Sequence, residues 1–342
     1  MSLSNFSDYV ERISRRIDLT RLKKLNILLT NVHLTQQGGT EQWILIMATT
    51  LRQLGHNVIV YSPRIGPFGE RYIAPVSILV DKPPRNGIDL LLINHNTCLE
   101  QVSGMSGIKI FTSHSTFLEV ERCVPGADMY VAVSEHIQQI EKKRGFDCHV
   151  IYNPIDATRF TPTSAVHSNI RTIFVRVTHD SEEGKYLRRV LRGRGIKLLT
   201  LAEKTEHLAD YYNKADLVVA IGRELVEAML CERNVLSMDV RGYIPHYGGA
   251  GMITANNFEK LKPYWFSGRE NPIPFDQKEL FLSELDAYDP RQGKKLRKLA
   301  TRHFHPRKIA LQYLYLYVAQ RRYLSRKIYH SSGEKKTTTE IL

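Results

Sequence analysis

The chain has 342 residues, 42% of them hydrophobic and 24% charged, with a net charge of +13, and this length predicts about two globular domains that each bury a core. No apolar run approaches the roughly 20 residues that cross a bilayer, and the first residues, MSLSNFSDYVERISRR, lack the apolar stretch of a secretory signal, so we expect a cytoplasmic protein. The four cysteines are far apart without a CxxC pair, which argues against a structural zinc site or disulfide framework and fits a reducing compartment.

Residues 1–24 predict an amphipathic helix. Its apolar residues recur at spacings of three and four and share one helix face: Phe6, Tyr9, Val10, Ile13 and Ile17. This face either packs on the body of the protein or lies on a membrane surface.

Residues 25–155 predict a first α/β domain. Short apolar strands alternate with helices, and a glycine loop joins the first strand to the first helix, as in a βαβ unit of a parallel sheet. Ser134 is a good N-cap for the last helix of this half. The predicted strands span 25–31, 57–62, 88–94, 109–112, 129–133 and 149–152, and the helices span about 41–54 and 135–144.

Residues 153–164 contain two prolines and no periodicity, so we interpret them as a linker leading into a second α/β domain at 156–305. Pro306 is well placed as the first residue of a further helix at 306–320, which precedes a tail at 321–342. The predicted strands of this half span 171–177, 196–201, 216–221 and 234–240, and the helices span about 183–192, 206–212, 224–231, 277–287 and 293–303.

The stretch 215–251 predicts a phosphate-binding turn. A continuous apolar strand, typical of a sheet covered on both faces, ends at Ile221, and a helix opens at Glu224. Between them, Gly222 lets the backbone approach a ligand beyond the carboxyl end of the strand, and the helix N-terminus suits a phosphate. Glu227, expected in the first helical turn, could accept hydrogen bonds from sugar hydroxyls. We therefore interpret the stretch as a nucleotide-sugar pocket.

Six short motifs in chain order resemble those of GT-B-fold glycosyltransferases, in particular retaining family 4. They cover nearly the whole body, from residue 25 to residue 318: Gly38-Gly39-Thr40-Glu41, Val133-Ser134-Glu135, Ile151–Asp156 followed by Arg159-Phe160, Val175-Arg176 with Lys185, Glu227-Ala228-Met229, and the helix at Phe304–Tyr317. The resemblance implies two Rossmann-like α/β/α domains facing each other across a cleft, with a closing helix that crosses back to the N-terminal domain.

The chain departs from the family pattern at one position. The family often has a second glutamate, near the transferred sugar, eight residues before the glutamate of its EAM motif, and here Val219 stands there. The segment Gly222–Glu227 is similar instead to a branch of the family with the motif GRxxLEA.

The resemblance assigns donor-binding roles in the second domain. Arg176 and Lys185 would neutralise the donor diphosphate as the bond to the anomeric carbon breaks. That role needs no metal, and the sequence has no DxD motif or His/Asp cluster at ligand spacing. Glu227 would hold the ribose, and Arg223 would contact the diphosphate or the sugar. The alternative for each is a surface cation or a charge at a helix terminus.

Two further residues of this half are candidates for the donor site. Glu224 fits a first-turn helix charge better than a site residue, although it stays a candidate. Gly249, in the glycine-rich loop 248–251, would wrap the sugar or the diphosphate, or else belongs to a connecting loop.

In the first domain, Gly38 and Gly39 would let their loop approach the donor phosphate or the acceptor, although such a pair also suits an ordinary turn before a helix. His114 follows a strand, and related enzymes have a histidine there near the sugar or the acceptor. His33 and His95 also follow strands, and a lone histidine is more often structural. Retention by front-face attack, as the resemblance implies, needs no strong enzymic base.

Nearly all of the net charge lies at the C-terminal end. From Arg291 onward the chain has 14 lysines and arginines against 2 acidic residues, so the first 290 residues carry about +1. Residues 321–342 mix these cations with aromatic side chains. That mixture suits an anionic membrane surface, a disordered solubilising tail or, less readily, nucleic acid.

The resemblance, together with these features, implies a retaining, metal-independent hexosyltransferase that uses no cofactor. Its donor would be a UDP- or GDP-linked sugar bound in the second domain. Its acceptor would be a hydroxyl of a glycan or lipid-linked glycan in the first domain, at the inner face of the membrane. Two alternatives stay open: a GT-B-like binding or scaffold subunit without catalysis, which the missing glutamate motivates, and a GT-B nucleotide-sugar epimerase.

Overall fold

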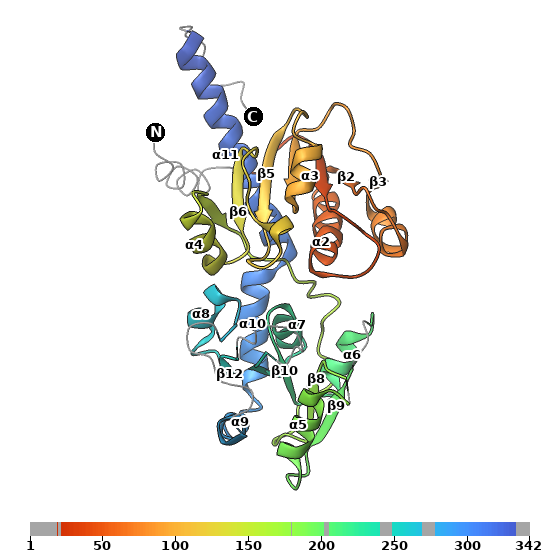
Figure 1. Ribbon diagram of the computed structural model, residues 1–342, viewed down its shortest axis with the longest axis vertical. Helices are drawn as coiled ribbons and strands as arrows, with labels where there is room; N and C mark the ends of the chain where they lie inside the picture. Colours follow the sequence, from red (N-terminus) through yellow and green to blue (C-terminus); the bar gives the residue numbers. More distant parts are fainter. Residues whose placement is uncertain are drawn as a thin grey trace. The chain divides into compact units, whose positions relative to one another are not determined.

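The computed structural model describes residue 19 and residues 22–178, 180–201, 205–239, 248–268 and 278–332, with side chains described as far as residue 325. Most of the helix predicted at residues 1–24 lies outside the described residues. The chain forms two compact units (Figure 1). Unit 1 comprises residues 1–154 and 306–342, and unit 2 comprises residues 155–305.

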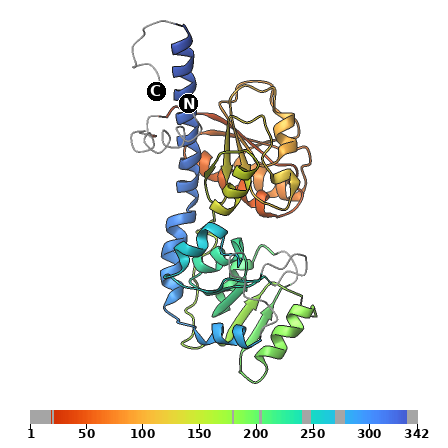
Figure 2. The ribbon, with the colours of Figure 1, turned by 60° about the vertical axis from the view of Figure 1, so that its left-hand side comes forward.

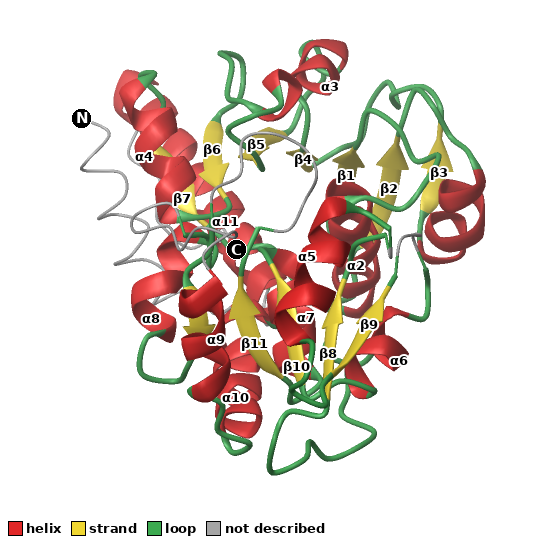
Figure 3. Ribbon diagram, turned by 60° about the horizontal axis from the view of Figure 1, so that its bottom comes forward, coloured by secondary structure: helices red, strands yellow, loops and turns green. Residues whose placement is uncertain are grey.

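Unit 1 is built on a seven-stranded sheet of order β3-β2-β1-β4-β5-β6-β7, in which every neighbouring pair is parallel. Its central strand, β4, is a run of Leu and Ile that is buried along its whole length, because helices cover the sheet (Figure 3). The strands are β1 (Asn26–Thr30), β2 (Asn57–Tyr61), β3 (Ile78–Val80), β4 (Leu90–Ile93), β5 (Ile108–Ser113), β6 (Met129–Ala132) and β7 (Cys148–Val150).

The helices of unit 1 are α2 (Gly39–Gln53), α3 (Asn96–Gln101), α4 (Glu135–Lys143) and α11 (Pro306–Ser332), with the short turns η2 (Gly69–Ile73), η3 (Ala74–Val76) and η4 (Glu119–Glu121). The predicted cap of α4 is confirmed, because the Ser134 side chain accepts a hydrogen bond from the Ile137 N–H at 3.2 Å. The sequence did not predict β3 or α3. One is a partly exposed edge strand of three residues and the other has fewer than two turns, so neither carries a clear periodic signal.

The helix α11 comes from the far end of the chain and belongs to the core of unit 1 (Figure 2). Its residues Ile309, Tyr313 and Tyr317 are buried in one hydrophobic cluster with Trp43 of α2. The Tyr313 hydroxyl lies 3.0 Å from Thr112 Oγ1 of β5. The helix runs unbroken to Ser332, so it does not end at residue 320, where the sequence analysis ended it before a tail at 321–342.

Unit 2 is built on a five-stranded sheet of order β12-β11-β10-β8-β9. Its strands are parallel except for β12, which pairs antiparallel with β11. The strand β12 begins at Gly251, inside the stretch predicted to be a glycine-rich loop. The strands are β8 (Thr172–Val175), β9 (Lys197–Thr200), β10 (Leu217–Ala220), β11 (Asn234–Ser237) and β12 (Gly251–Ile253).

The helices of unit 2 are α5 (Glu182–Leu191), α6 (Leu208–Asn213), α7 (Arg223–Leu230), α8 (Phe258–Leu261), α9 (Lys278–Asp286) and α10 (Gln292–Phe304), with the turn η5 (Lys262–Tyr264). The two ends of the unit meet, because the Ile155 N–H donates to the Phe304 carbonyl at 3.0 Å. The chain therefore enters and leaves unit 2 at one place.

Two buried charged side chains hold the entry segment of unit 2, residues 164–172, against its sheet. Arg233 is 1% exposed and donates to the carbonyl oxygens of Cys231 at 2.7 Å, Ala215 at 3.1 Å and Ser164 at 2.5 Å. The Asp216 carboxylate accepts hydrogen bonds from backbone N–H groups of the same entry segment and from the ring of His167. Burial alone would raise the pKa of Asp216, but these hydrogen bonds outweigh it and lower the pKa below its usual value.

Candidate functional site

The turn between β10 and α7 has the glycine that the sequence analysis singled out. Gly222 has φ 65° and ψ −126°, a conformation that residues with a side chain rarely adopt. A Cβ atom at this position would lie 3.3 Å from Cδ1 and 3.4 Å from Nε1 of Trp265. The helix α7 starts at Arg223, one residue earlier than predicted, directly beyond the carboxyl end of a buried parallel strand.

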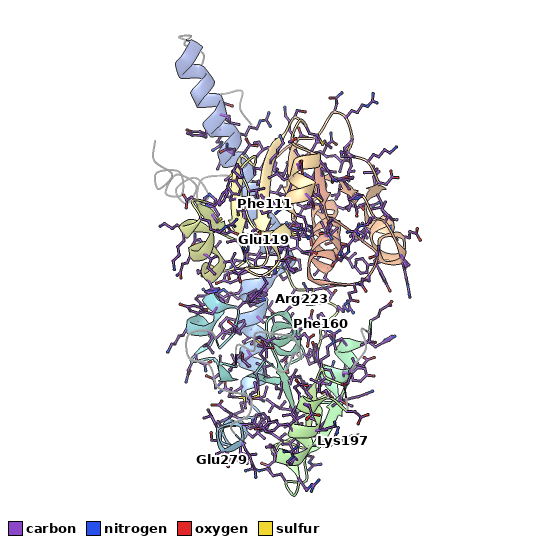
Figure 4. All side chains as sticks on the ribbon, viewed as in Figure 1. Phe111, Glu119, Phe160, Lys197, Arg223 and Glu279 are labelled. Carbon is purple, nitrogen blue, oxygen red and sulfur yellow. The ribbon has the colours of Figure 1, made fainter. Side chains whose placement is uncertain are left out.

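Two ion pairs and a tyrosine meet at the start of α7, where Figure 4 labels Arg223. Arg176, which follows β8, places Nη1 2.6 Å from Glu224 Oε1. Arg223 places Nε 2.7 Å from Glu227 Oε1, and the Tyr212 hydroxyl donates to Glu227 Oε2 at 3.2 Å. We call these five residues the α7 cluster.

Two groups of the α7 cluster, Tyr212 and Arg176, have shifted pKa values. Burial, followed by the nearby charge of Glu227, raises the pKa of Tyr212 well above 10, so its hydroxyl keeps its proton. Burial opposes the charge of Arg176, but Glu224 outweighs this effect and raises the pKa of the guanidinium. The cluster therefore contains two guanidinium groups, each paired with one carboxylate.

Glu227 is the fifth residue of α7 and not part of the first helical turn, so that detail of the sequence analysis was wrong. It is 5% exposed, and both of its carboxylate oxygens have a partner. A carboxylate has about four acceptor sites in all, so each oxygen can accept one more hydrogen bond. Val219, the position of the missing glutamate, is fully buried within β10 and lies in the hydrophobic core.

Two other predicted donor-site residues, Lys185 and Gly249, do not belong to the α7 cluster. Lys185 lies on α5 with Nζ 2.9 Å from Glu182 Oε1, whereas Arg176 pairs with Glu224. Gly249 is packed so tightly against β11 that a Cβ atom there would overlap the Ser237 carbonyl oxygen. Close packing of the backbone is therefore sufficient reason for this glycine.

At the carboxyl edge of the unit 1 sheet, Gly38 is the N-cap residue of α2, and Glu41 of the first turn folds back over it. The buried Glu41 carboxylate accepts a hydrogen bond from Asn31 Nδ2 at 3.2 Å and lies 3.1 Å from Nδ1 of His33. Burial raises the pKa of Glu41. The Cα of Gly39 faces open space.

His114 lies at the same edge. Its Nε2 is 2.9 Å from Asn94 Oδ1, and its ring packs edge-on against Trp43 with a centroid distance of 5.8 Å. Dense packing around the ring lowers the pKa of His114 to about 3, and burial lowers the pKa of the neighbouring His95 to about 4. Both imidazoles are neutral at pH 7 and can exchange hydrogen bonds without carrying charge.

The sequence analysis missed Glu121 of η4, because nothing in the pattern FTSHSTFLEVER separates it from its exposed neighbour Glu119. Its side chain is buried, and burial together with the charge of Glu41 raises its pKa to about 7. We call Asn31, His33, Glu41, Asn94, His114 and Glu121 the edge cluster.

Replacing Glu121 with glutamine should stabilise the protein at pH 8 and have no such effect at pH 4. The unfolded chain releases the Glu121 proton near pH 4.5 and the folded chain near pH 7, so the stability contributed by this group falls as the pH rises through that window. Above it, the charged carboxylate costs about 3 kcal/mol. Thermal unfolding of both proteins at each pH checks this. Glu70→Gln, at an exposed position, is the control, and an equal effect of Glu121→Gln at both pH values would contradict the prediction.

Among the described residues, no group of three His, Cys, Asp or Glu side chains is placed to hold a metal ion. Within this part of the chain, none of the helices has the length and apolar character needed to span a membrane.

No protein-family model matches the chain, and no curated protein sequence matches it. Solved structures do. A glycosyltransferase from Rickettsia africae ESF-5 is 13% identical, with a TM-score of 0.58 over 87% of this chain and 99% of that chain. The glycotransferase of kitacinnamycin is 11% identical, with a TM-score of 0.51 over 84% of this chain and 97% of that chain. The fold is therefore that of the GT-B glycosyltransferases, a mixed α/β fold with two Rossmann-like units, as the sequence analysis predicted.

Proposed function

We propose that this chain is a glycosyltransferase that moves a hexose from a nucleotide sugar to an acceptor hydroxyl, and that it retains the anomeric configuration as retaining family 4 does. The observation that supports this most is the α7 cluster. Two guanidinium groups and the N-terminus of α7 lie together beyond the carboxyl end of a parallel strand, where α/β sheets bind their ligands.

Each residue of the α7 cluster has a part in this proposal. Glu227 accepts hydrogen bonds from the ribose hydroxyls through its remaining acceptor sites. The diphosphate competes with Glu224 and Glu227 for the guanidinium groups of Arg176 and Arg223, which supply fixed positive charge as the leaving group departs. Lys185 contacts the diphosphate together with these two arginines only if its ion pair with Glu182 breaks. The proposed transfer reaction uses no metal ion.

The acceptor hydroxyl, in this proposal, is bound at the edge cluster of unit 1, beside Gly38 and Gly39. Asn31 Oδ1 and Asn94 Nδ2 are buried without a hydrogen-bond partner in the described part of the chain. One is an acceptor and the other a donor, which matches a sugar hydroxyl better than an anion. The cations at the C-terminal end would hold the protein at an anionic membrane that carries a lipid-linked acceptor.

The experiment that tests the donor site is a thermal-shift panel of UDP, GDP, ADP and their sugars. The right ligand at 100 times its Kd should stabilise the protein by about 2.7 kcal/mol. Glu227→Gln should remove that shift, because the neutral amide cannot pair with Arg223 or accept the ribose hydroxyls as strongly.

Glu279→Gln, at an exposed position of α9 labelled in Figure 4, is the matched control and should keep the shift. If no sugar nucleotide shifts the wild-type protein, or if Glu227→Gln keeps the full shift, the proposed donor site is wrong.

A further inference from the structure

The segment after α8 contains two strained residues in a row. Trp265 has φ 55° and ψ 38°, and Phe266 follows with φ 57°. Bulky residues rarely adopt this left-handed conformation, and they persist in it only where the surrounding structure holds them. Such positions are concentrated at ligand-binding sites, so this turn is a candidate for a functional role.

The surroundings of the turn are well defined. Phe266 is fully buried and packs against Phe258, with a centroid distance of 5.1 Å. The Ser237 hydroxyl at the end of β11 donates to the Phe266 carbonyl. The Trp265 ring stands at 81° to the Phe304 ring, with a centroid distance of 5.2 Å. These contacts fix the Trp265 side chain at the carboxyl edge of the unit 2 sheet.

The indole of Trp265 lies directly against the turn that precedes the α7 cluster. Its Cδ1 and Nε1 atoms lie 3.3 and 3.4 Å from the place where Gly222 would carry a Cβ atom, which is a tight contact. Trp265 keeps part of its surface exposed, whereas Trp43, the other tryptophan of the chain, is fully buried. The strained turn therefore presents an aromatic ring beside Gly222.

The order of residues along the turn and α7 indicates what this ring would meet. In the proposed donor site, Glu227 holds the ribose, and Arg223, one turn earlier, holds the diphosphate. The next group of a nucleotide sugar is the hexose, which falls beside Gly222 and Trp265. A hexose has an apolar face of C–H groups whose weak positive charge suits the negative face of an aromatic ring.

We propose that Trp265 is a sugar-binding residue of this protein, and that the apolar face of the donor hexose packs against its indole ring. This inference rests on the proposed function, because it takes the α7 cluster to be the diphosphate and ribose site. It assigns recognition of the hexose to a residue that belongs to none of the sequence motifs.

The test uses the intrinsic fluorescence of the full-length protein, which has only two tryptophans. The protein is titrated with the nucleoside diphosphate chosen by the thermal-shift panel and, separately, with the matching nucleotide hexose. We expect the nucleotide hexose to change the Trp265 emission and the diphosphate to leave it nearly unchanged. In Trp265→Phe the response should disappear, since the remaining emission comes from the buried Trp43.

Affinity gives a second readout. Trp265→Ala should weaken binding of the nucleotide hexose about tenfold and leave binding of the diphosphate within about twofold, with Trp265→Phe between wild type and alanine. An equal loss for both ligands, or no loss for either, would overturn the assignment while leaving the donor site intact. If the wild-type protein binds neither ligand, the proposed function fails and this inference fails with it.

Discussion

Replacing Arg176 with alanine is expected to lower kcat for sugar transfer by about 100- to 1000-fold, the loss that follows removal of one fixed charge or donor from a developing negative charge. The guanidinium of Arg176 lies beyond the carboxyl end of β8, 2.6 Å from Glu224 Oε1, and is charged at neutral pH. Without it, the leaving diphosphate loses one of its two guanidinium partners, and Glu224 loses the positive charge 2.6 Å from its carboxylate. Single-turnover transfer from the donor identified by thermal shift measures the effect.

Two variants control this experiment. Arg194→Ala removes an arginine whose ion pair with Asp286 is solvent-exposed, and it should leave kcat unchanged. Lys185→Ala should lower kcat by about tenfold or less, because Lys185 is half exposed and paired with Glu182. A loss below threefold for Arg176→Ala would refute the assigned role of this guanidinium. A loss for Lys185→Ala as large as that for Arg176→Ala would mean that Lys185 moves into the site.

The largest expected loss of stability comes from Arg233→Ala in unit 2. This change leaves the carbonyl oxygens of Ser164, Ala215 and Cys231 without their donor in a buried site. Breaking a buried charged network by removing one partner costs about 3–5 kcal/mol. For a domain of this size, that corresponds to a fall of about 10 °C in Tm. Calorimetry of the full chain should show the shift in one transition, that of unit 2.

Arg233→Met separates two causes of this loss. Methionine fills much of the same volume but donates no hydrogen bond, so it should recover only the part of the loss that comes from the cavity. Arg291→Ala is the control, because that side chain is 83% exposed and bonds only Asp289 among the described residues. If Arg233→Ala changes the free energy of unfolding by less than about 1 kcal/mol, water replaces the guanidinium at low cost.

The sequence predicted the fold well because its signals are local. Runs such as Leu90–Ile93 and Leu217–Ala220 are long enough to indicate buried parallel strands, and Ser134 marks a helix start through a bond to its own helix. The edge strands β3 and β12 have only three residues each, and β12 contains a glycine, so no periodic pattern identifies them.

The details of the candidate site depend on contacts between distant residues, which a single sequence does not reveal. Arg176 pairs with Glu224, 48 positions away, and Tyr212 reaches Glu227 from another helix. The sequence motifs identified the guanidinium and carboxylate residues but not their pairing. Trp265 was missed because the left-handed turn that directs it follows from the packing of Phe266 and from no turn motif.

The helix α11 is made last but packs in the core of unit 1, and this has a consequence for folding during synthesis on the ribosome. Ile309, Tyr313 and Tyr317 complete the core around Trp43, so this part of the unit 1 core must wait for residues made about 150 positions after Pro154. Unit 2 is continuous and can fold first as it emerges, since domains generally fold as units during translation. A nascent chain that stops before Pro306 would therefore display the apolar side of α2 to chaperones beside an already folded neighbour.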